Sequence, residues 1–153
     1  MSISKIKNSF ISNNLLSRGF TELSDIQNKI LDVYQNKKDL LVTSQTGSGK
    51  TIAYFLSIQD EISLKKVKEK SSPSVLIIAP TRELAIQVYE EALWVFKSEN
   101  INVVTTIGGM DIKKERKNLL TKFSLLIGTP GRINDHLRNC LLYTSPSPRD
   151  TMS

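Results

Sequence analysis

The glycine-rich segment from Ser44 to Thr51, S-Q-T-G-S-G-K-T, constrains the fold more than any other part of this chain. The apolar run from Leu40 to Thr43 precedes it, and residues 50–63, which have helical spacing, follow it. Glycines let the backbone turn tightly and point its N–H groups at phosphate oxygens, and the helix adds the positive end of its dipole. The order strand, glycine turn and helix therefore predicts a loop that binds nucleotide phosphates.

The side chains of this loop have distinct predicted tasks. Lys50 is expected to reach the β- and γ-phosphates, and the hydroxyl of Thr51 is expected to ligate Mg²⁺, so both serve phosphoryl transfer. The four residues that precede Lys50 are expected to surround the phosphates: Thr46, Gly47, Ser48 and Gly49. The general pattern G-x-x-x-x-G-K-[ST] has glycine where this chain has Ser44. An ordinary glycine turn is the alternative, but it does not explain a lysine at the helix start.

Short apolar runs alternate with longer segments of helical spacing along the chain. Four runs are predicted to be strands: Leu40–Thr43, Val75–Ala79, Ile101–Ile107 and Phe123–Ile127. The segments predicted to be helical are residues 3–18, 24–34, 50–63, 82–98 and 111–120. This alternation predicts an α/β domain with a parallel sheet flanked by helices. Trp94 and Phe96 share helical spacing with apolar neighbours and are predicted to be core residues.

The composition of the chain favours a single domain with an anionic partner and disfavours a disulfide or a zinc site. A chain of 153 residues holds one core, and its net charge of +6 with a pI near 9.5 favours an anionic partner such as nucleic acid. One cysteine, Cys140, and one histidine, His136, are too few for a disulfide or a zinc site, and His136 is predicted to be a surface or helix-cap residue. The lysine-rich segment 65–74 is predicted to be a solvated loop. No run is long enough to span a membrane and no secretory signal is evident, so a cytoplasmic location is predicted.

Three more motifs follow the other predicted strands. They are P-T-R-E-L-A from Pro80 to Ala85, the pair Gly108-Gly109, and T-P-G-R from Thr129 to Arg132. Together with the glycine-rich loop, this ordered set resembles the first RecA-like domain of DEAD-box ATP-dependent RNA helicases, a family that does not use glycine at the position of Ser44. The resemblance runs from about Gly19 to Asn139. It implies an incomplete RecA-like P-loop NTPase domain with ATP and Mg²⁺ as cofactors.

The same resemblance implies contacts with an RNA backbone. The residues in question are Pro80, Thr81, Arg82, Gly108, Gly109, Thr129, Pro130, Gly131 and Arg132. Each group falls just after a predicted strand, at the sheet edge where open α/β folds place ligands. Hydroxyls, helix-start N–H groups and arginine forks suit phosphate and sugar oxygens, so single- or double-stranded RNA is the predicted partner, held without base reading. Alternatively, Arg82 or Arg132 forms an ion pair with an acid such as Glu83 or Asp135.

Two residues near the N-terminus are implied to recognise adenine. The resemblance gives Phe20 an aromatic contact with the base and Gln27 a bidentate amide contact with its edge. Both have plainer alternatives, because Gln27 stands three residues after Ser24 in a capping-box pattern and Phe20 fits an ordinary core. This segment also differs from the usual sequence pattern of the family, because Leu23 and Asp25 stand where prolines are common.

The last residues differ from the rest of the chain. Cys140–Asp150, C-L-L-Y-T-S-P-S-P-R-D, resembles the in-frame translation of a transposase sequencing adapter. We therefore expect residues 1–139 to be part of a helicase ATP-binding domain and residues 140–153 to be a non-native or disordered tail. No D-E-A-D sequence occurs between Arg132 and Ser153. The segments that should supply the neighbouring strands are missing from this chain. We therefore expect the sheet edge next to the phosphate loop to have no pairing strand.

These absences separate the expected activity of the parent protein from that of the chain. The resemblance implies a parent that closes two RecA-like domains on ATP and single-stranded RNA and separates short duplexes. The 153-residue chain lacks the carboxylates and arginines that drive hydrolysis, so we expect it to have negligible ATPase and no helicase activity. The alternatives are a non-catalytic half-domain that binds nucleotide or RNA, a DNA-acting helicase relative and, less favoured, a small nucleotide kinase.

Overall fold

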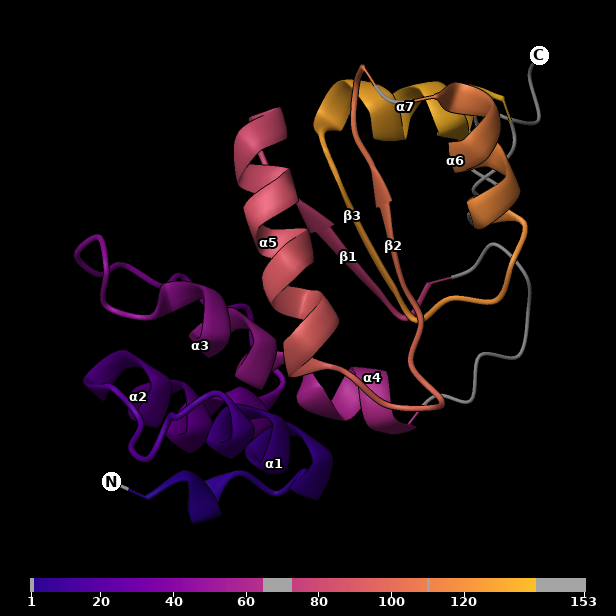
Figure 1. The fold of residues 1–153 in the computed structure, drawn as a ribbon. Coiled ribbons are helices and arrows are strands. Elements are labelled where there is room, and N and C mark those ends of the chain that lie inside the picture. The colour runs from indigo at the N-terminus through magenta and orange to yellow at the C-terminus, as the bar shows by residue number, and fades with distance from the viewer. Residues whose placement is uncertain (1, 65–72, 110, 140–153) are drawn as a thin grey trace.

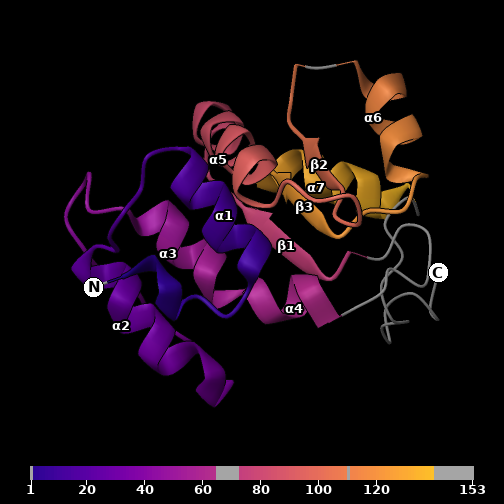
Figure 2. The same ribbon diagram turned by 60° about the horizontal axis from the view of Figure 1, so that its bottom comes forward.

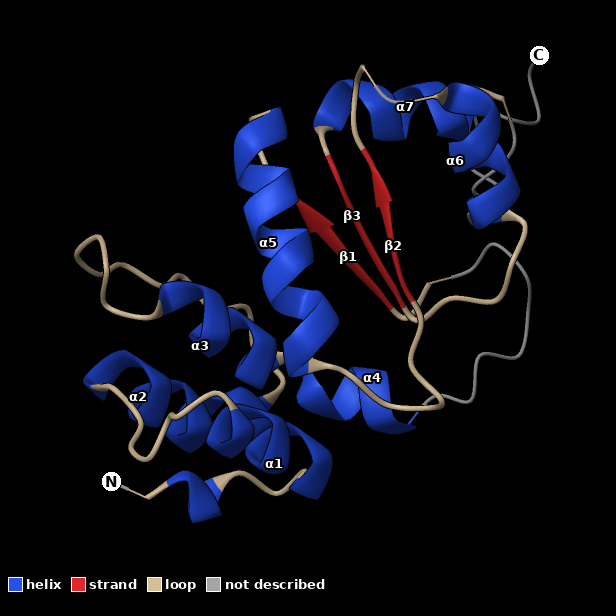
Figure 3. Ribbon diagram, viewed as in Figure 1, coloured by secondary structure: helices blue, strands red, loops and turns tan. Residues whose placement is uncertain are grey.

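The computed structural model describes residues 2–64, 73–109 and 111–139. Within them, three strands form one parallel sheet in the order β1-β3-β2. The strands are β1 (Val75–Ile78), β2 (Val103–Thr106) and β3 (Leu125–Gly128). Val75 and Val103 both pair with Leu125, so the strands start level, and all three arrows point to the same end of the sheet (Figure 3). The predicted parallel sheet is confirmed, and its carboxyl edge carries the segments after each strand.

Helices cover the two faces of this sheet. The crossovers are α5 (Arg82–Val95) and α6 (Ile112–Leu119), and α7 (Pro130–Arg138) follows β3. The N-terminal part contributes η1 (Ile3–Lys5), α1 (Ser9–Ser17), α2 (Asp25–Val33), η2 (Tyr34–Asn36), α3 (Lys50–Ser57) and α4 (Gln59–Leu64). The N-terminal helices gather on the side of α5, and α6 and α7 lie on the other side of the sheet (Figures 1 and 2).

Alternation along β3 explains why both faces are covered. Leu125 and Ile127 are buried in the large cluster with residues of α1, α2, α3 and α5. Leu126 points the other way, into a smaller cluster with Leu119 of α6 and Ile133 of α7. A strand without polar residues is typical of a strand that is covered on both faces. All four residues of β3 are buried, as this pattern predicts.

The helix predicted over residues 3–18 is interrupted in the structure. A short 3-10 turn, η1, is followed by Ile6 and Asn8 in extended conformations before α1 begins at Ser9. Ile3 and Ile6 are both buried, so packing against the core favours the break. Gly19, with φ +88°, follows α1 and donates its N–H to the carbonyl of Leu16, which confirms the predicted glycine cap.

The prediction of a strand at Leu40–Thr43 is wrong. The segment belongs to no strand among the described residues, and Leu41 is 93% exposed. It lies beside α2, where Leu40 and Val42 line a groove with Ile30 and Val33. A strand needs a neighbouring backbone that pairs with its N–H and C=O groups, and the described part of the chain offers none here.

Other predictions for single segments have mixed outcomes. The segment predicted over 50–63 is divided into α3 and α4, with Ile58 between them. Phe96 is buried as predicted, whereas Trp94 is only partly buried at the rim of the large cluster. Residues 65–72 and 140–153 lie outside the described residues, so the predictions of a solvated loop and a non-native tail stay predictions. Among described residues, no helix has the length and apolar character needed to cross a membrane.

We expect Gly128→Ala to destabilise the junction between β3 and α7. A Cβ at Gly128 would overlap the hydroxyl of Thr106 and lie 2.6 Å from its carbonyl oxygen and 2.9 Å from Cγ1 of Ile133. Because a backbone carbonyl cannot move away alone, the free energy of unfolding should fall by about 1–3 kcal/mol. Urea denaturation measures the change. Gly131→Ala is the matched control, since a Cβ there meets nothing within 4 Å, and an equal loss in both variants would contradict the steric argument.

Candidate nucleotide and nucleic-acid site

The glycine-rich loop turns through two left-handed glycines into the start of α3. Gly47 has φ +82°, and Gly49, the N-cap of α3, has φ +83°. Lys50 is the first residue of the helix, and its Nζ donates to the carbonyl oxygen of Ser44 at 2.8 Å. The hydroxyls of Ser44 and Ser48 also contact each other across the loop. The ammonium group is thus held against the turn, beside the N–H groups at the start of α3, where phosphate oxygens are attracted.

Gln27 connects α2 to this loop. Its Oε1 accepts from the backbone N–H of Ser24 at 2.9 Å, and its Nε2 donates to the carbonyl oxygen of Gly49 at 3.2 Å. The side chain is buried, and a Cβ at Gly49 would overlap Nε2. The capping alternative from the sequence is therefore confirmed, and Gln27 also supports the loop. An adenine contact by the remaining amide hydrogen and lone pair stays a prediction.

Phe20 makes a contact that sequence reasoning missed. Its ring stacks on Trp94 of α5, with centroids 5.9 Å apart and an angle of 19° between the planes. The guanidinium carbon of Arg18 lies 4.9 Å from the centroid of the Trp94 ring. The end of α1 is held on α5 by these contacts and by Asn14, whose Nδ2 donates to the carbonyl of Val95 at 3.0 Å. The adenine contact of Phe20 stays a prediction.

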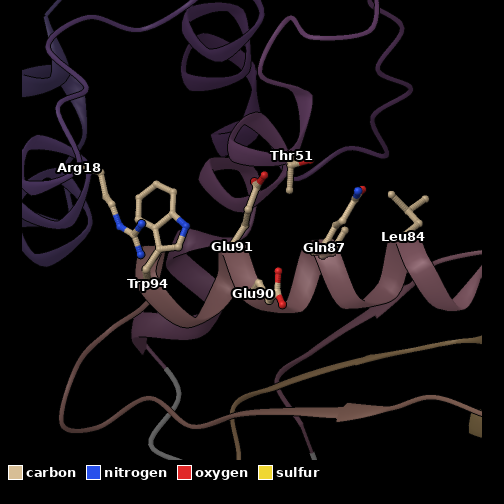
Figure 4. Close-up of a pocket in the computed structure, with 8 residues that line it drawn as sticks. Arg18, Thr51, Leu84, Gln87, Glu90, Glu91 and Trp94 are labelled. Atoms are coloured by element: carbon tan, nitrogen blue, oxygen red, sulfur yellow. The ribbon is translucent and has the colours of Figure 1, made fainter. Parts of the chain in front are cut away.

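A pocket lies between the start of α3 and α5 (Figure 4). Thr51 enters it from α3, opposite Gln87 and Glu91 of α5, and Trp94 and Arg18 close one end. Partial burial raises the pKa of the Glu91 carboxyl above its usual value. The predicted Mg²⁺ ligand Thr51 therefore borders a polar pocket, which suits an ion that takes its other ligands from phosphates and water.

The three predicted RNA segments meet at the carboxyl edge of the sheet. Thr81 is the N-cap of α5, and its Oγ1 accepts from the N–H of Leu84 at 3.2 Å. Arg82 lies over Gly109, since a Cβ at Gly109 would overlap Nη1 of Arg82. Gly109 has φ +82°, so a side chain at this position would be unfavourable for both reasons.

The third segment is joined to the second by the backbone. Thr129 is the N-cap of α7, with Pro130 at the first helical position, and its N–H donates to the carbonyl of Thr106 at 3.2 Å. Thr106 is the last residue of β2, just before the Gly108-Gly109 pair. The expectation that these segments gather at one sheet edge is confirmed, and their contact with RNA stays a prediction.

Arg132 and His136 share a partner that the sequence did not indicate. Nε of Arg132 lies 3.0 Å from Oε2 of Glu115 in α6, so the ion-pair alternative for Arg132 is confirmed, with Glu115 as the acid. His136 is fully buried, and its Nε2 lies 2.9 Å from the same oxygen. The prediction of a surface or cap role for His136 is wrong, because the inner face of α7 packs against the sheet and α6.

Comparison with known proteins places this arrangement in a family. Residues 24–146 match the family model described as DEAD/DEAH box helicase. The chain is 37% identical over 123 residues to ATP-dependent RNA helicase DBP4 of Debaryomyces hansenii, covering 80% of the chain and 16% of the relative. It is 38% identical over 123 residues to ATP-dependent RNA helicase HAS1 of Candida albicans, covering 79% of the chain and 21% of the relative. The chain thus spans a small part of these relatives.

Solved structures agree with this result. A DEAD box protein from Methanococcus jannaschii superposes with a TM-score of 0.74 at 31% identity, covering 89% of this chain and 36% of that one. A hypothetical ATP-dependent RNA helicase from Sulfolobus tokodaii gives 0.73 at 28% identity, covering 88% and 37%. The fold and the glycine-rich loop define part of a RecA-like P-loop NTPase domain. The chain belongs to the DEAD/DEAH box helicase family.

Proposed function

We propose that this chain is part of an ATP-dependent RNA helicase and supplies its phosphate loop and three contacts with an RNA backbone. The observation that carries this proposal is the meeting of the three motif segments at one sheet edge, with Arg82 over Gly109 and Thr129 bonded to Thr106. The phosphate-loop helix α3 packs on α5, the helix that begins with Arg82. The helix that would follow the phosphates is therefore in contact with the helix that begins at the proposed RNA contact Arg82.

On the nucleotide side, this chain would hold the triphosphate and its ion. The N–H groups at the start of α3 and the ammonium of Lys50 would bind phosphate oxygens, and the hydroxyl of Thr51 would contribute to the Mg²⁺ shell. ATP supplies the phosphoryl group whose transfer is coupled to the opening and closing of the parent enzyme. Gln27 keeps the loop in place through Gly49.

On the RNA side, the groups offered are hydroxyls, helix-start N–H groups and arginines. Such groups bind phosphate and sugar oxygens and carry no sequence information. Binding should therefore be insensitive to sequence and should weaken as salt rises, because counterions are released from the strand. A cytoplasmic location is part of this proposal.

We expect Arg82→Ala to weaken binding of a fluorescent single-stranded oligouridylate by about tenfold, because one charge-assisted phosphate contact is lost. Fluorescence anisotropy across a salt series measures it, and the slope of log affinity against log salt should become shallower by about 0.7. Arg138→Ala, an exposed arginine at the opposite end of α7 from Thr129, is the matched control.

Two results would contradict the proposal. One is equal binding by the Arg82→Ala and Arg138→Ala variants, and the other is absence of RNA binding by the unmodified chain. A single-stranded DNA of the same length is measured in parallel, because contacts with the 2′-hydroxyl distinguish RNA from DNA. Tighter binding of DNA than RNA would favour a DNA-acting relative.

A further inference from the structure

The carboxylate of Glu115 is buried where an apolar side chain is expected. The exposed residues of α6 are mostly charged, whereas Glu115 and Leu119, one turn apart, face the interior. Glu115 is only 4% exposed. Burial of a carboxylate is unfavourable unless hydrogen bonds and charges compensate it. An acid at position 115 therefore needs compensating partners in the interior.

Three groups surround the carboxylate: one precedes the Gly108-Gly109 pair, and two belong to α7. Oε1 accepts from the backbone N–H of Ile107 at 2.9 Å. Oε2 accepts from Nε2 of His136 at 2.9 Å and forms an ion pair with Arg132, whose Nε lies 3.0 Å away. A carboxylate is only an acceptor, so Nε2 of His136 carries the hydrogen in this contact. The side chains of Glu115 and Arg132 are both shielded, with 5% and 15% exposure, which strengthens their attraction.

Two of these groups connect Glu115 to two of the three predicted RNA segments. Ile107 directly precedes Gly108-Gly109, and Arg132 is the last residue of T-P-G-R. These segments follow different strands, β2 and β3. Glu115 thus contacts the backbone before the glycine pair and an arginine of T-P-G-R with the same carboxylate.

We propose that Glu115 is a positioning residue for RNA binding, which holds the Gly108-Gly109 loop and the Arg132 guanidinium in one fixed relative geometry. This inference rests on the function proposed above. Because Nε of Arg132 lies 3.0 Å from Oε2 of Glu115 in a shielded ion pair, the guanidinium is held near this carboxylate before a phosphate arrives. An arginine fixed in this way loses less conformational freedom on binding than a free side chain does. Glu115 acts through Arg132 and the loop and is not itself a ligand of the anionic strand.

Glu115→Gln tests this role with limited damage to the fold. The amide oxygen can still accept from Ile107, and His136 can accept from the amide by moving its hydrogen to Nδ1. The substitution removes the negative charge that pairs with Arg132, so the ion pair with the arginine is the contact selectively lost. We expect affinity for a fluorescent single-stranded oligouridylate to fall about tenfold, the effect of one charge-assisted contact.

The control removes the same charge from an exposed position of α7. Asp135→Asn should bind RNA no more weakly than the unmodified chain, since losing an acid makes the surface more attractive to an anion. The affinity of Glu115→Gln for a fluorescent ATP analogue should be unchanged, because the phosphate loop lies on other elements. Equal losses for ATP and RNA would show a general structural defect and would overturn the proposal.

A double-mutant cycle with Arg132→Gln shows whether Glu115 acts through Arg132. We expect Arg132→Gln and the double variant to bind RNA equally weakly, because glutamine at position 115 keeps the contact with Ile107 and the arginine is already absent. Additive losses would overturn the proposal. If Glu115→Gln does not fold by circular dichroism, Arg132→Lys replaces it, since lysine keeps the charge without the oriented fork. Unchanged RNA affinity in Arg132→Lys would then overturn the proposal.

The outcomes separate this inference from the proposed function. If the unmodified chain binds RNA and Glu115→Gln binds it equally well, the positioning role fails and the proposed function stands. If the unmodified chain binds no RNA, the proposed function fails, and the positioning role fails with it.

Discussion

Replacement of Lys50 by alanine should weaken ATP binding about 100-fold. In the structure, Nζ of Lys50 is held 2.8 Å from the carbonyl of Ser44, at the turn formed by two left-handed glycines. The ammonium is therefore already beside the helix start when phosphates arrive, and little ordering is needed. Two charge-assisted contacts with phosphate oxygens account for about 3 kcal/mol, which corresponds to the expected factor. Titration with a fluorescent ATP analogue in the presence of Mg²⁺ measures it.

A charge-matched control distinguishes this contact from general electrostatics. Lys97 is exposed beyond the end of α5, and Lys97→Ala removes the same charge. We expect Lys97→Ala to bind ATP almost as the unmodified chain does. Similar losses in both variants would show that Lys50 acts only through net charge. The Lys50→Ala variant also serves as the background for ATP turnover, in which we expect no difference from the unmodified chain.

The parts of the fold that could be predicted from the sequence depend on local patterns. The run L-L-I at Leu125–Ile127 indicates a strand buried on both faces, and each side is covered by a separate cluster. The spacing of Gly47 and Gly49 before Lys50 indicates a left-handed turn at a helix start, and both glycines have positive φ. In these cases the residues that decide the conformation lie within a few positions of one another.

The strand expected at Leu40–Thr43 shows where local patterns fail. The run has the composition of a strand, but pairing is decided by a neighbouring backbone and not by the run itself. Among the described residues, β1 pairs only with β3, and Leu40–Thr43 lies beside α2. Strand propensity therefore indicates only that the segment can pair into a sheet when another strand lies beside it.

The contacts of the candidate site also depend on distant residues. Glu115 and His136 lie in different helices, and neither shows in its own neighbourhood that it will meet the other. One signal was present in the sequence: Glu115 occupies the position one turn before Leu119, on the face of α6 that must be buried. An acid on such a face requires donors, and in the structure an arginine and a histidine of the following helix lie against it.

Phe55→Ala should lower the free energy of unfolding by about 3–5 kcal/mol, the usual cost of deleting a buried aromatic ring. Phe55 is 1% exposed, and its ring packs edge-to-face on Phe96 with centroids 5.0 Å apart. The pair joins α3, which begins at the phosphate loop, to the end of α5. A cavity there removes both packing and the aromatic contact. Urea denaturation followed by the fluorescence of Trp94, the single tryptophan, measures the loss.

Tyr54→Ala is the matched control, because Tyr54 precedes Phe55 on the same helix and is 43% exposed. Alanine also favours helix, so we expect a change of no more than about 1 kcal/mol. Native domains are stable by only about 5–15 kcal/mol, so the loss in Phe55→Ala is a large fraction of the total. Equal denaturation midpoints for the two variants would show that α3 is not held on α5 by this ring. If the ring does hold α3 on α5, nucleotide binding should fall in Phe55→Ala and persist in Tyr54→Ala, because the phosphate loop depends on α3 being docked.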